Sequence, residues 1–208
     1  MEEKMAIRLY LVRHGLTIWN HEFRYQGHTD ISLSSEGIAQ AKALQQRFQL
    51  ENFTAIFCSD LQRAQETARI INQPHKLRIQ VNQYFKEINF GEWEGLTYDD
   101  LKDKYPEQIK VWQKTPHLLR LERGETFVEL RDRALIGIRE ITSKYPEGNI
   151  LIVTHGGTIA SLICGLLEEP LTKMWDYKQK NSAVNILNIS DKKVTIELLN
   201  DTSHLQSD

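Results

Sequence analysis

The chain has few cysteines and no large excess of acidic or basic residues. It has two cysteines in 208 residues, and its formal net charge is −2. Because a disulfide framework needs several cysteine pairs, Cys58 and Cys164 are expected to be buried free thiols in a reducing compartment. The near balance of acidic and basic residues gives no sign of a nucleic-acid or membrane partner.

Long apolar runs are also missing. The most apolar stretch, residues 150–167, is interrupted by a His-Gly-Gly sequence, which favours a strand, a turn and a helix over a membrane span. The apolar run at 5–12 contains Arg8 and follows two glutamates, so it is a poor secretion signal. A cytoplasmic protein is therefore expected. The chain also lacks a Gly-x-x-x-x-Gly-Lys-[Ser/Thr] loop, which excludes a P-loop nucleotide hydrolase.

The chain does contain three short apolar runs, each followed by a polar junction and a helical pattern. We expect these runs to be strands, at residues 6–12, 54–58 and 149–154. Capping residues indicate where three helices begin: Ser34 or Ser35 for the first, Ser59 with Gln62 for the second, and Thr126 with Glu129 for the third.

Strands that alternate with helices predict a mainly parallel sheet with helices on both faces. Two further strand-like runs, 183–189 and 194–199, flank a polar turn at 190–192 and predict a terminal hairpin. The expected fold class is α/β, a three-layer α/β/α sandwich around a mostly parallel sheet with an antiparallel C-terminal strand. Residues 1–208 are expected to form a single domain with a lid insertion at about 92–125, where aromatic residues and prolines interrupt the alternation.

Side chains suited to anion chemistry follow these strand-like runs and a fourth one at 77–81. In an open α/β sheet, ligands bind beyond the carboxyl ends of the strands, so these side chains are expected to lie together. They are Arg13 and His14 after the first run, Arg63 one helical turn after the second, His155 after the third and Glu87 after the fourth.

A cluster so rich in positive charge is typical of a phosphate site. The guanidinium groups of Arg13 and Arg63 match phosphate oxygens, and a protonated His155 would add a third cation. The imidazole of His14 has a nitrogen lone pair that can attack phosphorus. Glu87 could protonate the leaving group and then deprotonate the water that hydrolyses phospho-His14.

Other interpretations of these residues remain open. A catalytic metal needs about three close His or carboxylate ligands, and neighbouring arginines repel a cation, so neither a metal nor any other cofactor is expected. Glu92 and Glu94 are alternative acids. Lys114 and Arg123 are candidate contacts to the rest of a substrate.

Residues 11–17, Leu-Val-Arg-His-Gly-Leu-Thr, resemble the signature of the histidine phosphatase superfamily, the phosphoglycerate mutase-like proteins. The resemblance continues in the family's order through most of the chain. The further matching segments are Asn20, Gln26-Gly27, Asp30, Leu33-Ser34, Gly37, Ser59 to Ala64, Thr67-Ala68, Glu87-Ile88, Gly91, Glu94 to Leu96 and His155 to Gly157.

The resemblance implies a role for each matching residue. His14 would be the nucleophile and Glu87 the proton donor. The phosphate would be bound by Arg13, Arg63 and His155, and the pocket would be lined by Thr17, Asn20, Gln26, Gly27 and the Gly156 amide.

Within this superfamily the sequence is more similar to the small-molecule phosphatases than to the mutases. Mutases carry a longer insertion before the segment equivalent to residues 122–126, and the shorter loop here suggests a pocket more open to water. The expected partner is a small phosphorylated substrate, without nucleic acid or membrane. A phosphoglycerate mutase and a non-catalytic module that binds phosphorylated ligands remain the alternatives, and the sequence leaves the oligomeric state open.

Overall fold

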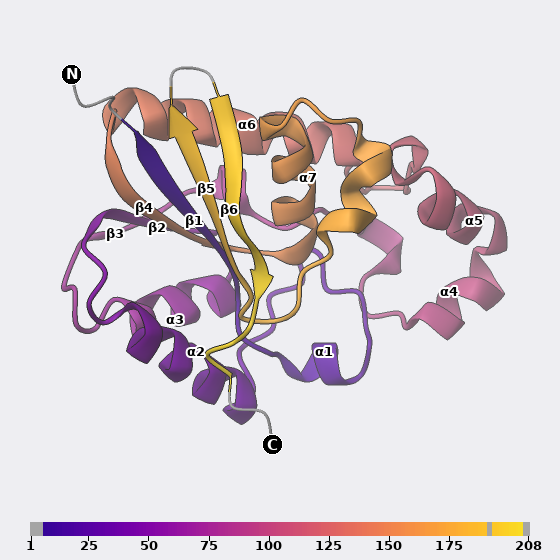
Figure 1. Ribbon diagram of the computed structural model, residues 1–208. Helices are drawn as coiled ribbons and strands as arrows, with labels where there is room; N and C mark the ends of the chain where they lie inside the picture. The colour runs from indigo at the N-terminus through magenta and orange to yellow at the C-terminus, as the bar shows by residue number, and fades with distance from the viewer. Residues whose placement is uncertain (1–5, 191–192, 206–208) are drawn as a thin grey trace.

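The computed structural model describes residues 6–190 and 193–205. Its centre is a six-stranded sheet with the strand order β3-β2-β4-β1-β5-β6 (Figure 1). The strands are β1 (Ile7–Arg13), β2 (Phe53–Cys58), β3 (Ile79–Val81), β4 (Gly148–Thr154), β5 (Val184–Ser190) and β6 (Lys193–Asp201).

Strand direction in the sheet confirms the predicted fold class. β2 pairs parallel with β3 and β4, and β4 pairs parallel with β1. β5 then pairs antiparallel with β1, and β6 antiparallel with β5. The predicted terminal hairpin is therefore present, although residues 191–192 of its turn lie outside the described residues.

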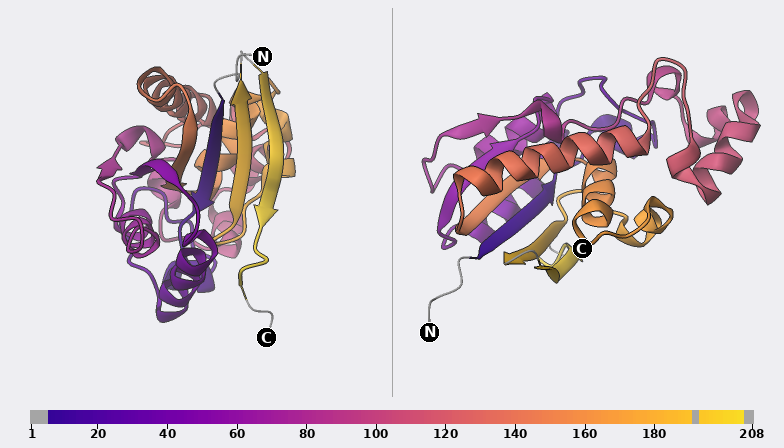
Figure 2. Two further views of the ribbon diagram at one scale, coloured as in Figure 1. Left: turned by 60° about the vertical axis from the view of Figure 1, so that its left-hand side comes forward. Right: turned by 90° about the horizontal axis from the view of Figure 1, so that it is seen from above.

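Two helices cover each face of the sheet, which gives the expected three layers (Figure 2). α2 (Ser35–Phe48) and α3 (Gln62–Ile71) pack on one face, while α6 (Phe127–Lys144) and α7 (Gly156–Leu166) pack on the other. The buried side chains divide accordingly into two clusters, one on each side of the sheet. The short helix α1 (Ile18–His21) lies in the loop after β1.

The predicted helix caps are present at the starts of α2 and α6 and absent at the start of α3. Ser34 is the N-cap of α2, and its Oγ accepts from the Gly37 amide. Thr126 and Glu129 form the predicted capping box of α6. The predicted box of Ser59 with Gln62 is wrong. Helix α3 begins at Gln62, and its N-cap Leu61 has no capping side chain. The Gln62 amide donates to Asp30 Oδ1 at 2.8 Å, and the Ser59 hydroxyl accepts from the Leu61 amide and from His155 Nε2.

The segment 92–125, the expected insertion, is partly helical. It contains α4 (Tyr98–Lys104), α5 (Pro106–Lys114) and a 3-10 turn (Pro116–Leu118), and Figure 2 shows α4 and α5 at the end of the molecule remote from β3. Its buried side chains belong to the same apolar cluster as those of α6 and α7: Trp93, Leu101, Ile109, Leu119 and Leu121.

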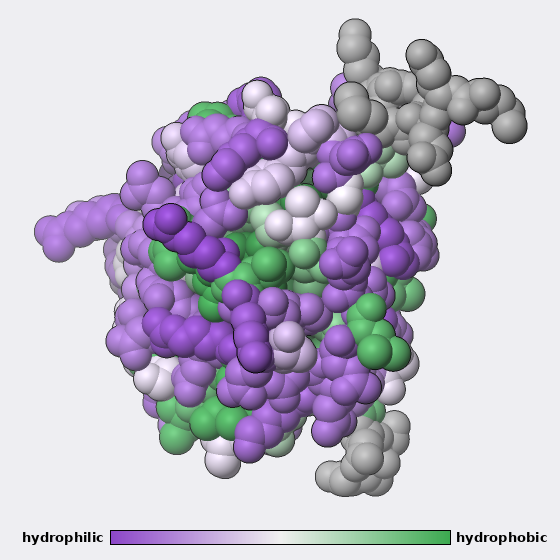
Figure 3. Space-filling view, turned by 90° about the vertical axis from the view of Figure 1, so that its left-hand side faces the viewer, coloured by the Kyte–Doolittle hydropathy of each residue, from purple (hydrophilic) through white to green (hydrophobic). Residues whose placement is uncertain are grey.

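The opposite end of the molecule is the edge formed by the three-residue strand β3. Figure 3 shows this end as mainly hydrophilic, with a small apolar area near its middle. Remaining 3-10 turns are Gln83–Phe85, Gly91–Trp93 and Leu171–Tyr177. Within the described residues, no helix is both long and apolar enough to cross a bilayer, and residues 150–167 form β4 and α7 as expected.

Candidate active site

The register between β1 and β4 brings two histidines together. Arg13 at the end of β1 pairs with Thr154 at the end of β4, so the next residue of each chain segment leaves the sheet at the same level. The ring centroids of His14 and His155 lie 5.1 Å apart. The expectation that parallel strand ends would gather these side chains is met.

The hydrogen bonds of His14 define which ring nitrogen is free. Its Nδ1 lies 2.7 Å from the carbonyl oxygen of Gly15. Because a carbonyl only accepts, Nδ1 carries the proton and Nε2 keeps the lone pair. Burial lowers the pKa of His14 well below its usual value, and the charges of Arg63 and Arg13 lower it further. The ring is therefore a neutral imidazole with a nucleophilic Nε2.

His155 is fully buried and belongs to a chain of hydrogen bonds. Arg63 Nε donates to its Nδ1 at 3.3 Å, so the proton is on Nε2, which donates to Ser59 Oγ at 2.8 Å. Burial, Arg63 and His14 hold its pKa well below the usual value. The expectation of a protonated His155 is wrong, since the surrounding charge and the accepting Nδ1 both favour the neutral ring.

Two arginines, the buried Arg63 and the half-buried Arg13, supply the positive charge. Arg63, in the first turn of α3, donates to the carbonyl oxygens of Thr29 and Gly27 at 2.9 and 2.7 Å. Burial lowers its pKa to about 10, which leaves it charged at neutral pH. Arg13 donates from Nη1 to the Gln179 carbonyl at 2.7 Å, and its buried Nε has no partner among the described residues.

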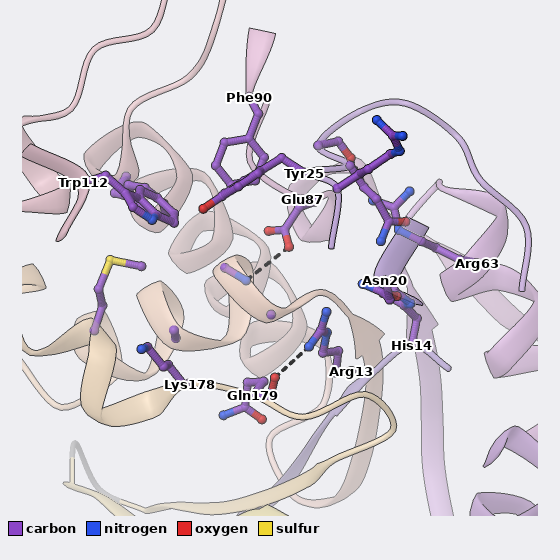
Figure 4. Close-up of a pocket in the computed structure, with 18 of the residues that line it drawn as sticks. Arg13, His14, Asn20, Tyr25, Arg63, Glu87, Phe90, Trp112, Lys178 and Gln179 are labelled. Carbon is purple, nitrogen blue, oxygen red and sulfur yellow. Dashed lines mark hydrogen bonds between the residues drawn. The ribbon is translucent and has the colours of Figure 1, made fainter. Parts of the chain in front are cut away.

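The carboxylate of Glu87 is held by the N-terminus of α7. It accepts from the amides of Gly157 and Thr158, both at 3.1 Å, and from the Thr158 hydroxyl at 3.2 Å. The second residue of α7 must be small here, because a Cβ on Gly157 would lie 2.8 Å from Glu87 Oε1. An acidic side chain is thus fixed by helix donors at the rim of the cluster of Arg13, Arg63 and His14 (Figure 4).

These groups line a cavity of about 320 Å³. The sequence-predicted residues that line it are Arg13, His14, Arg63, Glu87, Asn20, Gln26, Gly27 and Gly156. The two that do not are Thr17 and His155. His155 lies directly behind the wall, in contact with Arg63, and so still acts on the site through a lining residue.

Thr17 was expected to line the pocket, but it does not line the cavity. Its side chain is fully buried, forms the capping box of α1 with Asn20, and donates to Gln26 Oε1 at 3.0 Å. Both of its partners reach the cavity. Thr17 therefore positions two lining residues instead of lining the cavity itself.

Lys114 and Arg123, the candidate contacts to the rest of a substrate, do not line the cavity. Arg123 lies in a turn with φ +58° and lines a separate recess, as does Glu92. Glu94, the other alternative acid, accepts from the amides of His28 and Thr29 at 2.8 and 2.9 Å. Its carboxylate holds the loop whose Gly27 and Thr29 carbonyls accept from Arg63, and Glu94 does not line the cavity.

Sequence analysis missed most of the wall opposite the arginines. Trp112 belongs to the expected insertion, and Gly157 belongs to the motif at the second histidine, but neither was assigned to the cavity. The other lining residues were not assigned to the site either: Arg24, Tyr25, Phe90, Phe127, Ala160, Met174, Trp175, Lys178 and Gln179. Among the described residues there is no group of three or more His, Cys, Asp or Glu side chains placed to hold a metal ion.

Comparison with known sequences gives a match over nearly the whole chain. The family "Histidine phosphatase superfamily (branch 1)" matches residues 9–202. The chain is 30% identical to Phosphoserine phosphatase 1 of Hydrogenobacter thermophilus, over 96% of this chain and 94% of that protein. It is 31% identical to the Adenosylcobalamin/alpha-ribazole phosphatase of Escherichia coli, over 93% and 96%.

Comparison with solved structures agrees. YhfR of Bacillus stearothermophilus superposes with a TM-score of 0.90 at 32% identity, covering 95% of this chain and 98% of that one. The similarity therefore includes the sheet, both helical layers and the strand ends that carry the histidines.

Proposed function

Since the chain belongs to the histidine phosphatase superfamily, we propose that it is a phosphatase of small-molecule phosphate monoesters that works through a phosphohistidine on His14 and needs no metal. Two named relatives, from Hydrogenobacter thermophilus and Escherichia coli, are small-molecule phosphatases. One observation carries the proposed mechanism: His14 has its Nδ1 proton tied to the Gly15 carbonyl, which leaves the Nε2 lone pair beside Arg13 and Arg63.

In the first step, His14 Nε2 attacks phosphorus and the bond from phosphorus to the ester oxygen breaks. The electron pair of that bond leaves with the oxygen. The charge on the non-bridging oxygens is stabilised by Arg13 and Arg63, whose guanidinium groups are fixed in advance by backbone carbonyls. Because these cations need no rearrangement during transfer, the protein supplies the stabilisation that a metal supplies in other phosphatases.

His155 supports this step through its neighbours. Its neutral ring accepts from Arg63 Nε and donates to Ser59 Oγ, so it fixes the orientation of the guanidinium. A positive charge on the His155 ring, whose centroid lies 5.1 Å from that of His14, would make the Nε2 lone pair of His14 less basic and so less nucleophilic. The neutral tautomer therefore suits attack by His14.

Glu87 is the proposed proton donor. Its protonated form gives its proton to the leaving oxygen, and the resulting carboxylate is held by the α7 amides. In the second step the same carboxylate removes a proton from water. The water oxygen bonds to phosphorus, the bond from phosphorus to Nε2 breaks, and His14 is regenerated with release of phosphate.

The domain organisation is part of the proposal. We propose one domain over residues 1–208, with 92–125 as a lid over the end of the cavity remote from His14. The support is that Trp112 of this segment lines the cavity while its neighbours share the apolar cluster of α6 and α7.

The test is phosphate release from para-nitrophenyl phosphate in the presence of a chelator. The wild type is expected to turn over, and His14→Asn is expected to lose at least about a thousandfold in kcat, as enzymes do when the nucleophile is removed. His21→Asn is the matched control, because His21 is an exposed histidine in the next helix that does not line the cavity. Loss of activity in chelator with recovery on adding a divalent metal would overturn the metal-independent mechanism.

The same preparation separates hydrolysis from isomerisation. With 3-phosphoglycerate as the substrate, a phosphatase releases inorganic phosphate and a mutase forms 2-phosphoglycerate. Accumulation of 2-phosphoglycerate without phosphate would replace the proposal by the mutase reaction. Saturable binding without either product would leave only a binding module.

A further inference from the structure

The cavity is divided into two chemically different ends, and only one of them is used by the reaction. Figure 4 shows Arg13, His14 and Arg63 at one end, and Trp112, Phe90 and the ring of Tyr25 at the other, with Glu87 between them. A volume of about 320 Å³ is more than a phosphate group needs and is at the small end of cavities that hold a whole small ligand. The second end must therefore accommodate the alcohol part of the ester.

One wall of this second end is aromatic and fixed by mutual packing. Trp112 packs edge-on against Trp175, with ring centroids 4.7 Å apart, and against Phe90 at 5.7 Å. Tyr25 packs against Phe90 at 5.2 Å. Rings that hold one another in edge-to-face contacts form a preorganised apolar surface, and such a surface binds a flat apolar group without a large loss of side-chain entropy.

A part of α7 with almost no side chains runs along the cavity and begins at Gly156, beside Arg13. Gly156, Gly157 and Ala160 all line the cavity, and the first and last of these are four residues apart, on one face of the helix. We call the space that α7 and the aromatic rings line together the slot. Because glycine and alanine line it on the α7 side, it has room for a planar group beside the rings.

A cation lies beside the aromatic wall. Lys178 lines the cavity, and its Nζ is 5.3 Å from the centroid of the Trp175 ring. Within the part of the chain that the structure describes, no carboxylate lies within 4.0 Å of this ammonium group, whereas Arg24 is paired with Glu22 at 2.6 Å. Lys178 is therefore available to a ligand.

The charges of the cavity can be balanced against those of a substrate. Arg13 and Arg63 together match a phosphate dianion. Glu87 has its own donors in the Gly157 and Thr158 amides and the Thr158 hydroxyl, so its carboxylate is not the partner of Lys178. The charge of Lys178 then remains, and one further negative group on the substrate would balance it.

We propose that the substrate class is a phosphate monoester with a planar apolar ring and a second anionic group, such as a carboxylate, on the far side of that ring. This inference rests on the proposed phosphatase function. The ring occupies the slot between α7 and the aromatic wall, and the second anion contacts Lys178. Trp175 and Lys178 are then specificity-determining residues.

The test compares three substrates with similar leaving groups. They are para-carboxybenzyl phosphate, its primary amide, and a straight-chain phosphooxy-carboxylate of the same length. The wild type is expected to prefer the acid to the amide by about fivefold in kcat/KM, which corresponds to a partly exposed ion pair. It is expected to prefer the ring to the chain by about tenfold, because the chain loses more rotamer freedom on binding.

Two variants assign these preferences to residues. Lys178→Met keeps the alkyl stem and is expected to bring the ratio of acid to amide to about one, whereas Lys180→Met, an exposed neighbour outside the cavity, is expected to keep the ratio of about five. Ala160→Leu places a branched side chain in the slot and is expected to remove the preference for the ring over the chain.

The outcomes separate this inference from the proposed function. Equal kcat/KM for the three substrates, or an unchanged ratio of acid to amide in Lys178→Met, would overturn the substrate class and leave the phosphatase intact. Absence of hydrolysis of all three substrates and of para-nitrophenyl phosphate would overturn the phosphatase itself. Full preferences in the wild type that disappear in the two variants would support both.

Discussion

Replacing Ser59 with alanine tests the hydrogen-bond chain behind the cavity. Ser59 Oγ accepts the Nε2 proton of His155 at 2.8 Å, and His155 Nδ1 accepts from Arg63 Nε at 3.3 Å. Both Ser59 and His155 are fully buried. In Ser59→Ala the imidazole proton loses its acceptor at a place that the surrounding protein closes to water, and the longer hydrogen bond from the Leu61 amide, at 3.3 Å, is lost as well.

The expected size of the effect follows from this burial. Leaving a buried donor unsatisfied costs about 1–3 kcal/mol of the free energy of unfolding. For a chain of 150–250 residues, each kcal/mol corresponds to a shift in Tm of about 2–4 °C, so we expect Ser59→Ala to lower Tm by about 2–12 °C. The ring of His155 is also freed to change tautomer. Arg63 would then lose its acceptor, and kcat/KM is expected to fall by about tenfold to a hundredfold, as when a group that orients a ligand is removed.

Ser161→Ala is the matched control for this experiment. Ser161 is equally buried, but its Oγ has no partner among the described residues. Removing an unsatisfied hydroxyl is expected to leave Tm unchanged or to raise it, with no effect on kcat/KM. The assays are thermal unfolding followed by circular dichroism and hydrolysis of para-nitrophenyl phosphate. If Ser59→Ala matched the wild type in both Tm and kcat/KM, the hydrogen-bond chain would have no role.

Three other predictions concern the proton donor, the helix that holds it and the buried histidines. Glu87→Gln is expected to lower kcat/KM by about a hundredfold or more for an alkyl phosphate, and by less for para-nitrophenyl phosphate, whose leaving group needs little protonation; equal losses on both substrates would contradict the assigned role. Gly157→Ala is expected to lower kcat/KM far more than Gly156→Ala. The new Cβ would lie only 2.8 Å from Glu87 Oε1 in Gly157→Ala, whereas in Gly156→Ala it would lie 3.4 Å from Arg13 Nε. Equal kcat/KM in the two variants would contradict this prediction. The pKa of His14 is held well below 6.5, first by burial and then by the arginines, so its contribution to the free energy of unfolding is complete above about pH 6.5 and is lost as the pH falls towards its pKa in the folded state. Urea unfolding from about pH 7.5 to about pH 5.5 should therefore show a smaller loss of stability in His14→Asn than in the wild type, and a larger loss in the variant would show the sign to be wrong.

The part of the site at the strand ends was predictable because topology alone brings it together. His14 and His155 follow strands that lie side by side and run parallel, so their closeness did not depend on any detail of packing. The position of Glu87 was harder to predict from strand topology. The strand before it has three residues, and the carboxylate is placed by the amides of α7, whose contribution the sequence alone does not reveal.

The errors have a common physical cause, which is competition between local and distant partners. The spacing of Ser59 and Gln62 fits a helix cap, but the Gln62 amide donates to the distant Asp30. The Ser59 hydroxyl accepts from the buried imidazole of His155 as well as from the Leu61 amide. His155 was expected to be charged because phosphate binding favours a cation. Arg63, ninety-two positions away, donates to its Nδ1 and favours the neutral ring.

The far wall of the cavity could not be predicted for a different reason. Trp175 and Lys178 follow α7 in an irregular segment, a 3-10 turn and its continuation, where no period of two or 3.6 residues assigns a side chain to one face. Lys178 is exposed and looks like an ordinary surface lysine in the sequence. Only the folded chain shows that this segment closes the cavity beside Trp112.

The most direct test of the central claim is to trap the phosphorylated enzyme. Rapid acid-free quenching of the wild type with a radiolabelled phosphate monoester, in chelator, is expected to give a phosphoenzyme that is stable in alkali, labile in acid and located on the peptide that contains His14. His14→Asn should give no label. Turnover of the wild type without a detectable phosphoenzyme in the pre-steady state, or label on any residue other than His14, would contradict the account.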